Sequence, residues 1–199
     1  MEKVNKDGQT LEEFLASYNS DAWKKPAVTS DIVLFSERNE KLVVLLVKRG
    51  NHPYIGDWAL PGGFLNENES CEDAAKRELM EETGLINENL EQLVTVSTPY
   101  RDPRAWTITN CFFAVLESPE AVVGLDDADD ADWFSIDYAS QGDTYEIVLK
   151  NSRGDVLDCV LDVKRTAGGD IDINKTTIRK HGGVAFDHAK IILYAIEKL

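Results

Sequence analysis

The sequence has few cysteines and no long apolar run. Its three cysteines, Cys71, Cys111 and Cys159, are odd in number and far apart, which argues against a disulfide framework and a thiolate metal site. No apolar stretch approaches the ~20 residues that span a membrane, and the N-terminal MEKVNKDGQT lacks the apolar core of a signal peptide. We therefore expect a soluble, cytoplasmic protein that does not engage a membrane.

Positive charge is also scarce, because 21 lysines and arginines stand against 36 aspartates and glutamates, for a formal net charge of −15. This balance opposes binding to nucleic acid or to an anionic membrane surface, so neither is an expected partner. A small anionic substrate would be repelled as well, unless a metal ion and a few local cations invert the field at its site. Each arginine near a candidate site is therefore informative.

The chain of 199 residues, 43% of them hydrophobic, suits one domain that buries about 70% of its unfolded surface. Residues 1–25 hold a short helical pattern, which Thr10 caps and Glu13 completes as a capping box. The apolar face of this helix must cover either its own domain or a partner subunit. The main domain is expected at residues 26–199.

Apolar, β-branched runs predict the strands of that domain. Residues 31–35 and 42–47, separated by the polar SERNEK, predict a hairpin. The second run contains VVLLV, which is typical of a central strand covered on both faces. Further strands are expected at residues 93–97 and 107–116, so the sequence indicates mixed α/β content.

Residues 63–85, GFLNENESCEDAAKRELMEETGL, contain a predicted helix with an acidic face. Ser70 is a good N-cap, and Gly84 supplies a left-handed stop. Glu78, Glu81 and Glu82 follow at i, i+3 and i+4, so their carboxylates project from one side of the helix.

Three like charges on one helical face repel each other, and a divalent cation would reverse the sign of that interaction. Carboxylate ligands without a nearby cysteine or histidine favour Mg²⁺ or Mn²⁺ over zinc. The pattern therefore indicates a site for a hard metal ion.

The spacing also matches a known signature, in which Gly, five residues, Glu, seven residues and Arg-Glu precede an apolar residue, any residue, Glu-Glu, any residue, Gly and an apolar residue. Average residue usage gives a chance match of roughly one in 10⁸ per start position. The chain therefore resembles the Nudix hydrolases, which implies an α/β/α sandwich with a mixed sheet and a loop-helix-loop metal site. The positions are filled by Gly63, Glu69, Arg77, Glu78, Leu79, Glu81, Glu82, Gly84 and Leu85.

This resemblance implies that Glu78, Glu81 and Glu82 hold magnesium, or manganese, with the Gly63 carbonyl as an extra ligand. The general base does not follow from the spacing. We choose Glu81, over Glu82 or an acidic residue on a later loop.

Arg77 belongs to the same catalytic set. By resemblance it forms a structural salt bridge with Glu69, and we expect it to orient carboxylates rather than to touch substrate.

A wider pattern, with FLASYN, TSDIVLF, KRGNHPYIGDWALPGGF, RDPR, WFSID and AFDHAKII, resembles the branch of ADP-ribose pyrophosphatases and ADP-ribose-sensing regulators. It covers roughly residues 11–138 and 181–198. Trp58 also fits a core position, and the two arginines of RDPR also fit salt bridges to surplus carboxylates. The substrate-binding residues that the resemblance implies are Arg49, Trp58, Phe64, Arg101 and Arg104.

Three later segments are less informative. The run DDADDAD at residues 126–132 is either a second metal site or a solvated loop, after which Trp133 begins a short buried strand. Residues 140–180 contain a predicted β-hairpin insertion, which fits a lid, a dimer arm or decoration. Asp187 is expected to cap a final helix, with His188 as a structural hydrogen-bonding residue.

Three functional hypotheses follow. The first is magnesium-dependent hydrolysis of ADP-ribose to AMP and ribose phosphate, by a homodimer as in the relatives. The second is a non-catalytic ADP-ribose sensor, although the intact signature argues for turnover and the winged-helix segment of the related regulators is missing. The third changes the substrate to a dinucleoside polyphosphate, NADH or an oxidised nucleotide.

Overall fold

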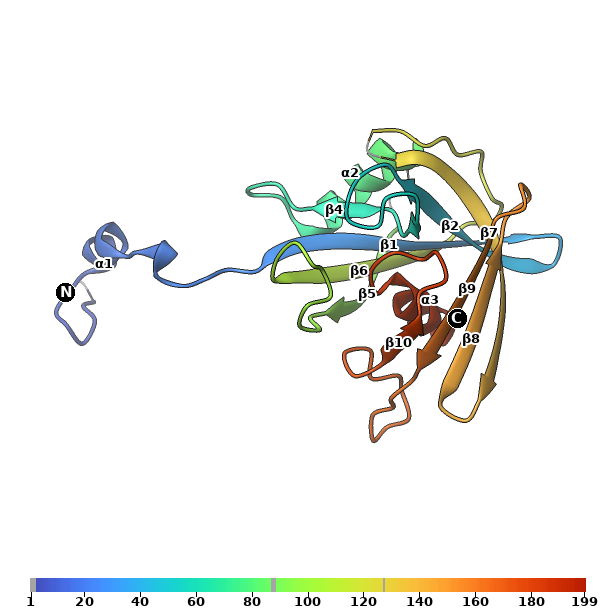
Figure 1. Cartoon of the computed structure of the whole chain (residues 1–199). Helices are drawn as coiled ribbons and strands as arrows, with labels where there is room; N and C mark the ends of the chain where they lie inside the picture. The colour runs from blue at the N-terminus through green and yellow to red at the C-terminus, as the bar shows by residue number, and fades with distance from the viewer. Residues whose placement is uncertain (1–2, 87–88, 127) are drawn as a thin grey trace.

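A single mixed sheet organises the protein, as the computed structural model shows for residues 3–86, 89–126 and 128–199 (Figure 1). The strand order is β10-β9-β8-β7-β2-β1-β6-β5, with β3 paired to β2 and β4 paired to β1. The strands are β1 (Ala27–Arg38), β2 (Lys41–Arg49), β3 (Trp58–Ala59), β4 (Gly62–Phe64), β5 (Glu91–Val96), β6 (Thr107–Val115), β7 (Ala128–Gln141), β8 (Thr144–Lys150), β9 (Val156–Asp162) and β10 (Thr177–Lys180). The helices are α1 (Leu11–Ser17), the short 3₁₀ helix η1 (Ser20–Ala22), α2 (Cys71–Thr83) and α3 (His188–Ile196).

The predicted hairpin of β1 and β2 is confirmed, with Phe35 opposite Val44. Its turn is tighter than the predicted SERNEK loop, because both strands continue to a two-residue turn at Asn39 and Glu40. Both turn residues have positive φ, 52° and 60°, which matches the right-handed twist of the flanking strands. β1 also runs parallel to β6, so the sheet is mixed as expected.

Alternate residues of β1 supply two separate cores. Ile32 and Leu34 pack with α2 on one face of the sheet, whereas Val33 and Phe35 pack with α3 on the other face. All four side chains are fully buried. β2 alternates in the same way, as predicted for a strand covered on both faces, and the α/β/α arrangement is confirmed.

The two helices of the sandwich begin differently. In α2, the Ser70 hydroxyl accepts a hydrogen bond from the Asp73 N–H, and Gly84 ends the helix at φ 75°, both as predicted. Asp187 is the residue before α3, but its side chain makes no capping hydrogen bond, so that prediction is wrong. Its carboxylate binds Arg101 instead, and α3 is held by burial of eight of its nine residues.

β7 begins at Ala128, inside the acidic run, so the prediction of a solvated loop there holds only before this strand. Arg153 explains how the strand tolerates its charges, because its Nη1 lies 2.6 Å from an Asp130 oxygen and its Nε lies 2.9 Å from an Asp132 oxygen. Asp127 lies outside the described residues.

The predicted hairpin within residues 140–180 is confirmed as β8 and β9. It continues the main sheet, because β8 pairs with β7, and β10 then pairs with β9 as an edge strand that the sequence did not reveal. β10 is short and rich in charge, so it lacks the apolar alternation that predicts strands.

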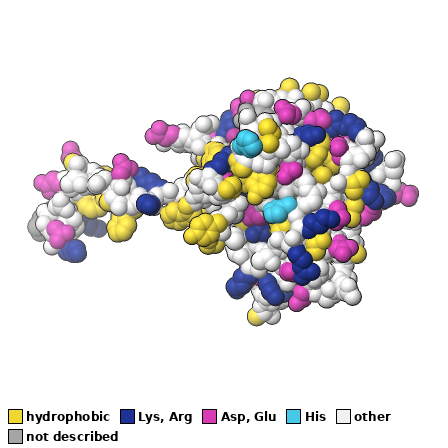
Figure 2. Space-filling view, viewed as in Figure 1, with side chains coloured by type: hydrophobic (Ala, Val, Ile, Leu, Met, Phe, Trp, Pro, Cys, Tyr) yellow, Lys and Arg dark blue, Asp and Glu magenta, His cyan; other side chains and the backbone are white. Residues whose placement is uncertain are grey.

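The N-terminal helix forms with its predicted capping box but buries none of its residues. It projects from the domain in Figures 1 and 2, and Leu11, Leu15 and Trp23 are 70%, 59% and 73% exposed. Across the described ranges, no helix is both long enough and apolar enough to span a bilayer.

Candidate active site

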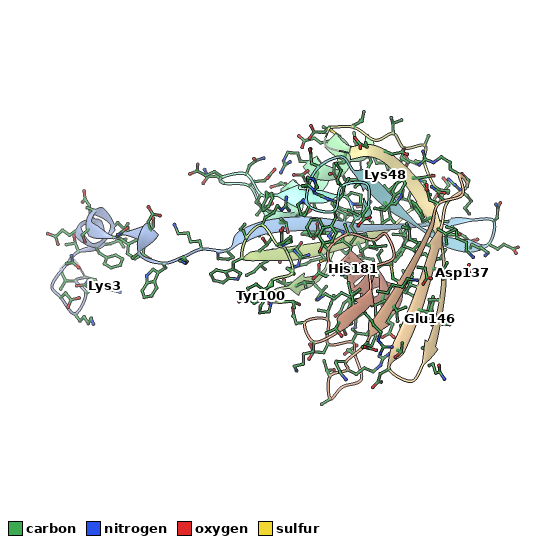
Figure 3. All side chains as sticks on the ribbon, viewed as in Figure 1. Lys3, Lys48, Tyr100, Asp137, Glu146 and His181 are labelled. Carbon is green, nitrogen blue, oxygen red and sulfur yellow. The ribbon has the colours of Figure 1, made fainter. Side chains whose placement is uncertain are left out.

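A cavity of about 290 Å³ lies where the acidic face of α2 meets the ends of β1, β2 and β4. The loop between β5 and β6 and the start of α3 close its other sides. In Figure 3, Lys48 marks the end of β2 at this cavity, and Tyr100 marks the loop between β5 and β6 without lining the cavity itself. The residues that line it include Asp31, Arg49, Gly62, Gly63, Phe64, Arg77, Glu78, Glu81, Glu82, Arg101, Arg104, Asp126, Phe186 and His188.

Gly62 and Gly63 allow the backbone of β4 to lie very close to neighbouring groups. A Cβ added at Gly63 would overlap the Glu78 carboxylate, and one added at Gly62 would overlap the Ser30 carbonyl oxygen. Gly62 also has φ 150°, a conformation that other residues rarely adopt. Gly63 therefore leaves room for the Glu78 side chain at the cavity wall, and Gly62 lets the backbone of β4 lie close to β1.

Arg77 is the centre of a four-way network. Its Nε and Nη2 donate to the two oxygens of Glu69 at 2.7 and 2.9 Å, and Nη2 also donates to the Phe64 carbonyl at 3.0 Å. Its Nη1 donates to Glu78 at 2.7 Å and to Glu81 at 2.9 Å. The hydrogen bonds from Arg77 lower the pKa of Glu69 to about 2, so this pair is ionised at neutral pH.

The three signature glutamates line the same cavity but have different partners. The Arg77 guanidinium bridges Glu78 and Glu81, while a Glu82 oxygen accepts a hydrogen bond from the Gly62 N–H at 2.9 Å. Within the described part of the chain, no three carboxylate, imidazole or thiol groups lie close enough to hold a metal ion. Arg77 therefore neutralises part of the negative charge for which the spacing alone indicated a metal ion.

Two of these carboxylates nevertheless fit a hard cation. Burial raises the pKa of Glu82 to about 8, against the opposing effect of the Gly62 hydrogen bond. Burial also raises the pKa of Glu78, despite its contact with Arg77. The ionised form of both side chains therefore lacks full compensation by the protein, and the ligand atoms that these two carboxylates offer are oxygens, which suits Mg²⁺ or Mn²⁺.

Arg101 is buried, with a side chain only 4% exposed. Its Nε and Nη2 donate to the two oxygens of Asp187 at 3.1 and 2.6 Å, and Nη2 lies 3.6 Å from an Asp31 oxygen. The sequence left two alternatives for this arginine, substrate binding or a salt bridge to surplus carboxylates, and the structure shows the salt bridge. Its guanidinium is occupied by carboxylates of the chain itself.

Arg104 lies at the mouth of the cavity with its side chain 41% exposed. Asp102 holds it, because the Arg104 Nη2 donates to an Asp102 oxygen at 2.8 Å. Its guanidinium carbon is 5.0 Å from the ring centre of Phe64 and 5.5 Å from that of Phe186. This cation therefore faces the cavity between two aromatic rings.

The other two predicted substrate-binding residues, Arg49 and Trp58, lie in different places. Arg49 lines the cavity, where its Nε donates to the Pro53 carbonyl at 2.8 Å and its guanidinium stacks on Phe186 at 4.9 Å. Trp58 is 3% exposed and packs edge-on against Phe134, outside the cavity wall. The structure thus places Trp58 in the core, which is the alternative that the sequence left open.

Sequence reasoning missed Asp31, which lines the cavity with only 6% of its surface exposed. A charged residue inside the apolar run of β1 was the available signal. His188 does act as a structural hydrogen-bonding residue, because its Nδ1 accepts the Leu60 N–H at 2.8 Å. Asp126, from the acidic run, also lines the cavity. It is therefore a residue of the kind named above as an alternative to Glu81, an acidic residue on a later loop that could act as the general base.

Curated relatives match part of this chain. An ADPR responsive transcriptional repressor NtrR of Acinetobacter baylyi is 33% identical over 63% of this chain and 51% of its own length. An ADP-ribose pyrophosphatase of Methanocaldococcus jannaschii is 41% identical over 56% of this chain and 63% of its own length. The match therefore spans about half to five eighths of these two relatives.

The structural comparison agrees with the sequence comparison. The NUDIX domain of Shewanella oneidensis NrtR, solved in complex with ADP ribose, superposes with a TM-score of 0.67 and 31% identity. That match covers 96% of this chain and 99% of the other. The family model described as the NUDIX domain matches residues 25–151, which is more than half of the chain, so the protein belongs to the Nudix hydrolase family.

Proposed function

We propose that this protein is a divalent-cation-dependent hydrolase that cleaves the pyrophosphate of ADP-ribose to give AMP and ribose phosphate. The observation that carries the proposal is the acidic wall of the cavity, where Glu78, Glu81 and Glu82 lie together and the absence of a side chain at Gly63 leaves room for the Glu78 carboxylate. The relatives named for ADP-ribose supply the substrate class.

In this proposal Glu78, Glu81 and Glu82 would hold Mg²⁺ or Mn²⁺, with the Gly63 carbonyl as an extra ligand. The ion supplies charge neutralisation at the pyrophosphate and activation of the attacking water. Arg77 has other partners in Glu69 and the Phe64 carbonyl, so it can release Glu78 and Glu81 while staying anchored.

The chain's own residues have separate tasks. Glu81 is 39% exposed at the cavity wall, where it can accept a proton from water as the general base. Arg49 and Arg104 provide positive charge at the cavity for the substrate phosphates. Phe64 and Phe186 present ring faces beside these cations, and the buried Arg101 acts through its carboxylate partners.

A substrate panel tests this proposal most fully. The purified chain is incubated with ADP-ribose, a dinucleoside polyphosphate, NADH and an oxidised nucleotide, each with Mg²⁺, Mn²⁺ or EDTA, and products are separated by chromatography. We expect AMP from ADP-ribose with metal and none with EDTA. Faster turnover of another member of the panel would reassign the substrate, and turnover in EDTA would remove the metal.

An ADP-ribose sensor is the second candidate, since one relative is named as an ADPR responsive repressor and one structural neighbour holds ADP ribose. Calorimetry with ADP-ribose separates the two functions. Binding without AMP formation in Mg²⁺ favours the sensor, whereas AMP formation favours the enzyme. The predicted absence of a nucleic-acid partner is tested in the same preparation by a DNA gel-shift assay.

We also propose a homodimer. The apolar face of α1 is exposed in the described chain, and Phe14 and Tyr18 contact each other there with ring centres 5.5 Å apart. Covering this face with a second copy would remove apolar surface from water. Sedimentation is expected to show a dimer, and a monomer at working concentration would contradict it.

A further inference from the structure

The first turn of α3, taken together with the preceding Asp187, buries ionisable side chains that packing alone does not require. Asp187, His188 and Lys190 are 7%, 4% and 3% exposed. Burying such groups costs free energy unless each has hydrogen-bonding or charged partners. Apolar residues at the same positions would satisfy the core, so the partners of these three side chains indicate what they do.

Two of the three hold the loop between β5 and β6. The Asp187 carboxylate accepts hydrogen bonds from the Nε and Nη2 of Arg101, and the Lys190 Nζ lies 3.2 Å from the same carboxylate. Lys190 also donates to the Thr98 hydroxyl at 3.0 Å. The loop is thus fixed to α3 at its beginning and at its middle, through contacts shielded from water.

The position of this loop sets the position of Arg104. Asp102 and Arg104 follow Arg101 directly along the loop and bind each other, and the Arg104 guanidinium stacks on Phe64. Any shift of the loop relative to α3 would therefore move the exposed cation away from the aromatic ring at the cavity mouth.

His188 holds the opposite wall of the cavity. Burial lowers the pKa of His188, so its neutral ring can accept the Leu60 N–H at Nδ1. Leu60 lies two residues before Gly62, whose own N–H donates to Glu82. The imidazole therefore fixes the strand end that precedes the signature glycines.

We propose that the first turn of α3 is the positioning element of the active site, in which Asp187 and Lys190 orient the arginine-bearing loop and His188 orients the glycine-bearing loop. This inference rests on the proposed function for its kinetic consequences. One rigid helical turn then keeps the substrate-binding wall and the carboxylate wall in register, although none of its three side chains needs to touch the reacting atoms.

Steady-state kinetics of variants at two neighbouring residues test whether Asp187 and His188 orient different loops. Asp187→Asn weakens the hold on the arginine loop, so we expect KM for ADP-ribose to rise about tenfold with little change in kcat. His188→Leu removes the acceptor for Leu60, so we expect kcat to fall about tenfold with little change in KM. His188→Asn places an oxygen near the position of Nδ1 and is expected to recover most of the lost kcat.

Glu197→Gln is the matched control, at the residue that directly follows the same helix. Glu197 accepts hydrogen bonds from Arg165 at 2.7 and 3.0 Å, away from the cavity, so this variant should keep both kinetic constants. If Asp187→Asn and His188→Leu instead lowered kcat and raised KM together, in proportion to a loss of melting temperature, their role would be structural only and the inference would be overturned.

Hydrogen exchange of the metal-free protein tests the same inference independently of any substrate. We expect His188→Leu to speed exchange of the Leu60 amide severalfold and His188→Asn to restore its protection, whereas Asp187→Asn speeds exchange in residues 98–106. Unchanged exchange in both variants would refute the positioning role. If wild-type protein released no AMP from ADP-ribose but these exchange changes occurred, the proposed substrate would fail and the positioning role would stand.

Discussion

Helices α2 and α3 cover opposite faces of the same sheet, but they use burial in opposite ways. Only four of the 13 residues of α2 are buried, and its remaining surface presents carboxylates to the cavity. In α3, eight of nine residues are buried, two of those are His188 and Lys190, and the buried Asp187 directly precedes the helix. One helix thus offers its charge to a ligand, whereas the other encloses its charge within the protein.

The difference shows how burial changes the role of a polar side chain. Exposed to the cavity, the carboxylates of α2 remain available for exchange between Arg77 and another cation. Enclosed by the core, Asp187 is bound to Arg101 and Lys190 and is positioned to orient rather than to react.

The largest effect is expected from the charge of α2. Glu82→Gln removes a proposed metal ligand and Glu81→Gln the proposed base, so each should lower kcat by about 10²- to 10⁴-fold with the fold intact. Circular dichroism verifies folding. Glu72→Gln is the control, since Glu72 pairs with Lys76 on the same helix outside the cavity. Turnover like that of wild type in both variants would refute the assignment.

Truncation of the core under α3 should have the next largest effect. Ile192 is fully buried, so Ile192→Ala should lower the free energy of unfolding by about 2–5 kcal/mol. Leu15→Ala on the exposed α1 should change it by no more than about 0.5 kcal/mol in the monomer. Urea unfolding measures both, and similar losses would mean that α1 is packed in solution.

Arg77 should stabilise the metal-free protein more than the metal-bound protein. Arg77→Gln leaves Glu69, Glu78 and Glu81 without their shared cation, so we expect a loss of about 1–3 kcal/mol in EDTA. Mg²⁺ should restore part of this loss by replacing the charge. Lys76→Gln, which removes a neighbouring surface cation, is the control. An equal loss with and without Mg²⁺ would contradict exchange of Arg77 for metal.

The smallest predicted effect is a pH dependence from the buried imidazole of α3. The pKa of His188 is lowered by burial, despite Asp31 and Asp187 nearby and with Arg101 and Arg49 adding to the shift. The unfolded chain therefore takes up a proton that the folded chain does not, and stability falls as pH drops below the ordinary value of 6.5. The slope is at most about 1.4 kcal/mol per pH unit.

His188→Asn removes this titration, so the difference in unfolding free energy between the variant and wild type isolates it. Wild type should lose stability relative to His188→Asn as urea unfolding is repeated from pH 7 to pH 5. Parallel curves over this range would show that His188 is not buried in its neutral form.

The parts of the fold that could be predicted are those encoded by neighbouring residues. Ser70 and Gly84 mark both ends of α2, and Thr10 with Glu13 marks the start of α1, because caps act on backbone groups within one turn. The hairpins and strands β5 and β6 follow from apolar alternation. The glutamate spacing likewise revealed which side of α2 is acidic.

What could not be predicted depends on partners far along the chain. Asp187 has the sequence context of a cap, but Arg101, 86 residues away, takes its carboxylate. The start of β7 is concealed by aspartates that Arg153 neutralises. The spacing of the glutamates also could not show that the Arg77 guanidinium bridges two of them, because rotamers are decided by packing.

Binding of Mn²⁺ to the metal-free protein, followed by electron paramagnetic resonance, tests most directly whether the acidic face of α2 holds a divalent cation. We predict saturable binding by wild type that Mg²⁺ displaces, and its loss in a variant carrying both Glu78→Gln and Glu82→Gln. No saturable binding by wild type, or unchanged affinity in the double variant, would contradict the proposed metal site.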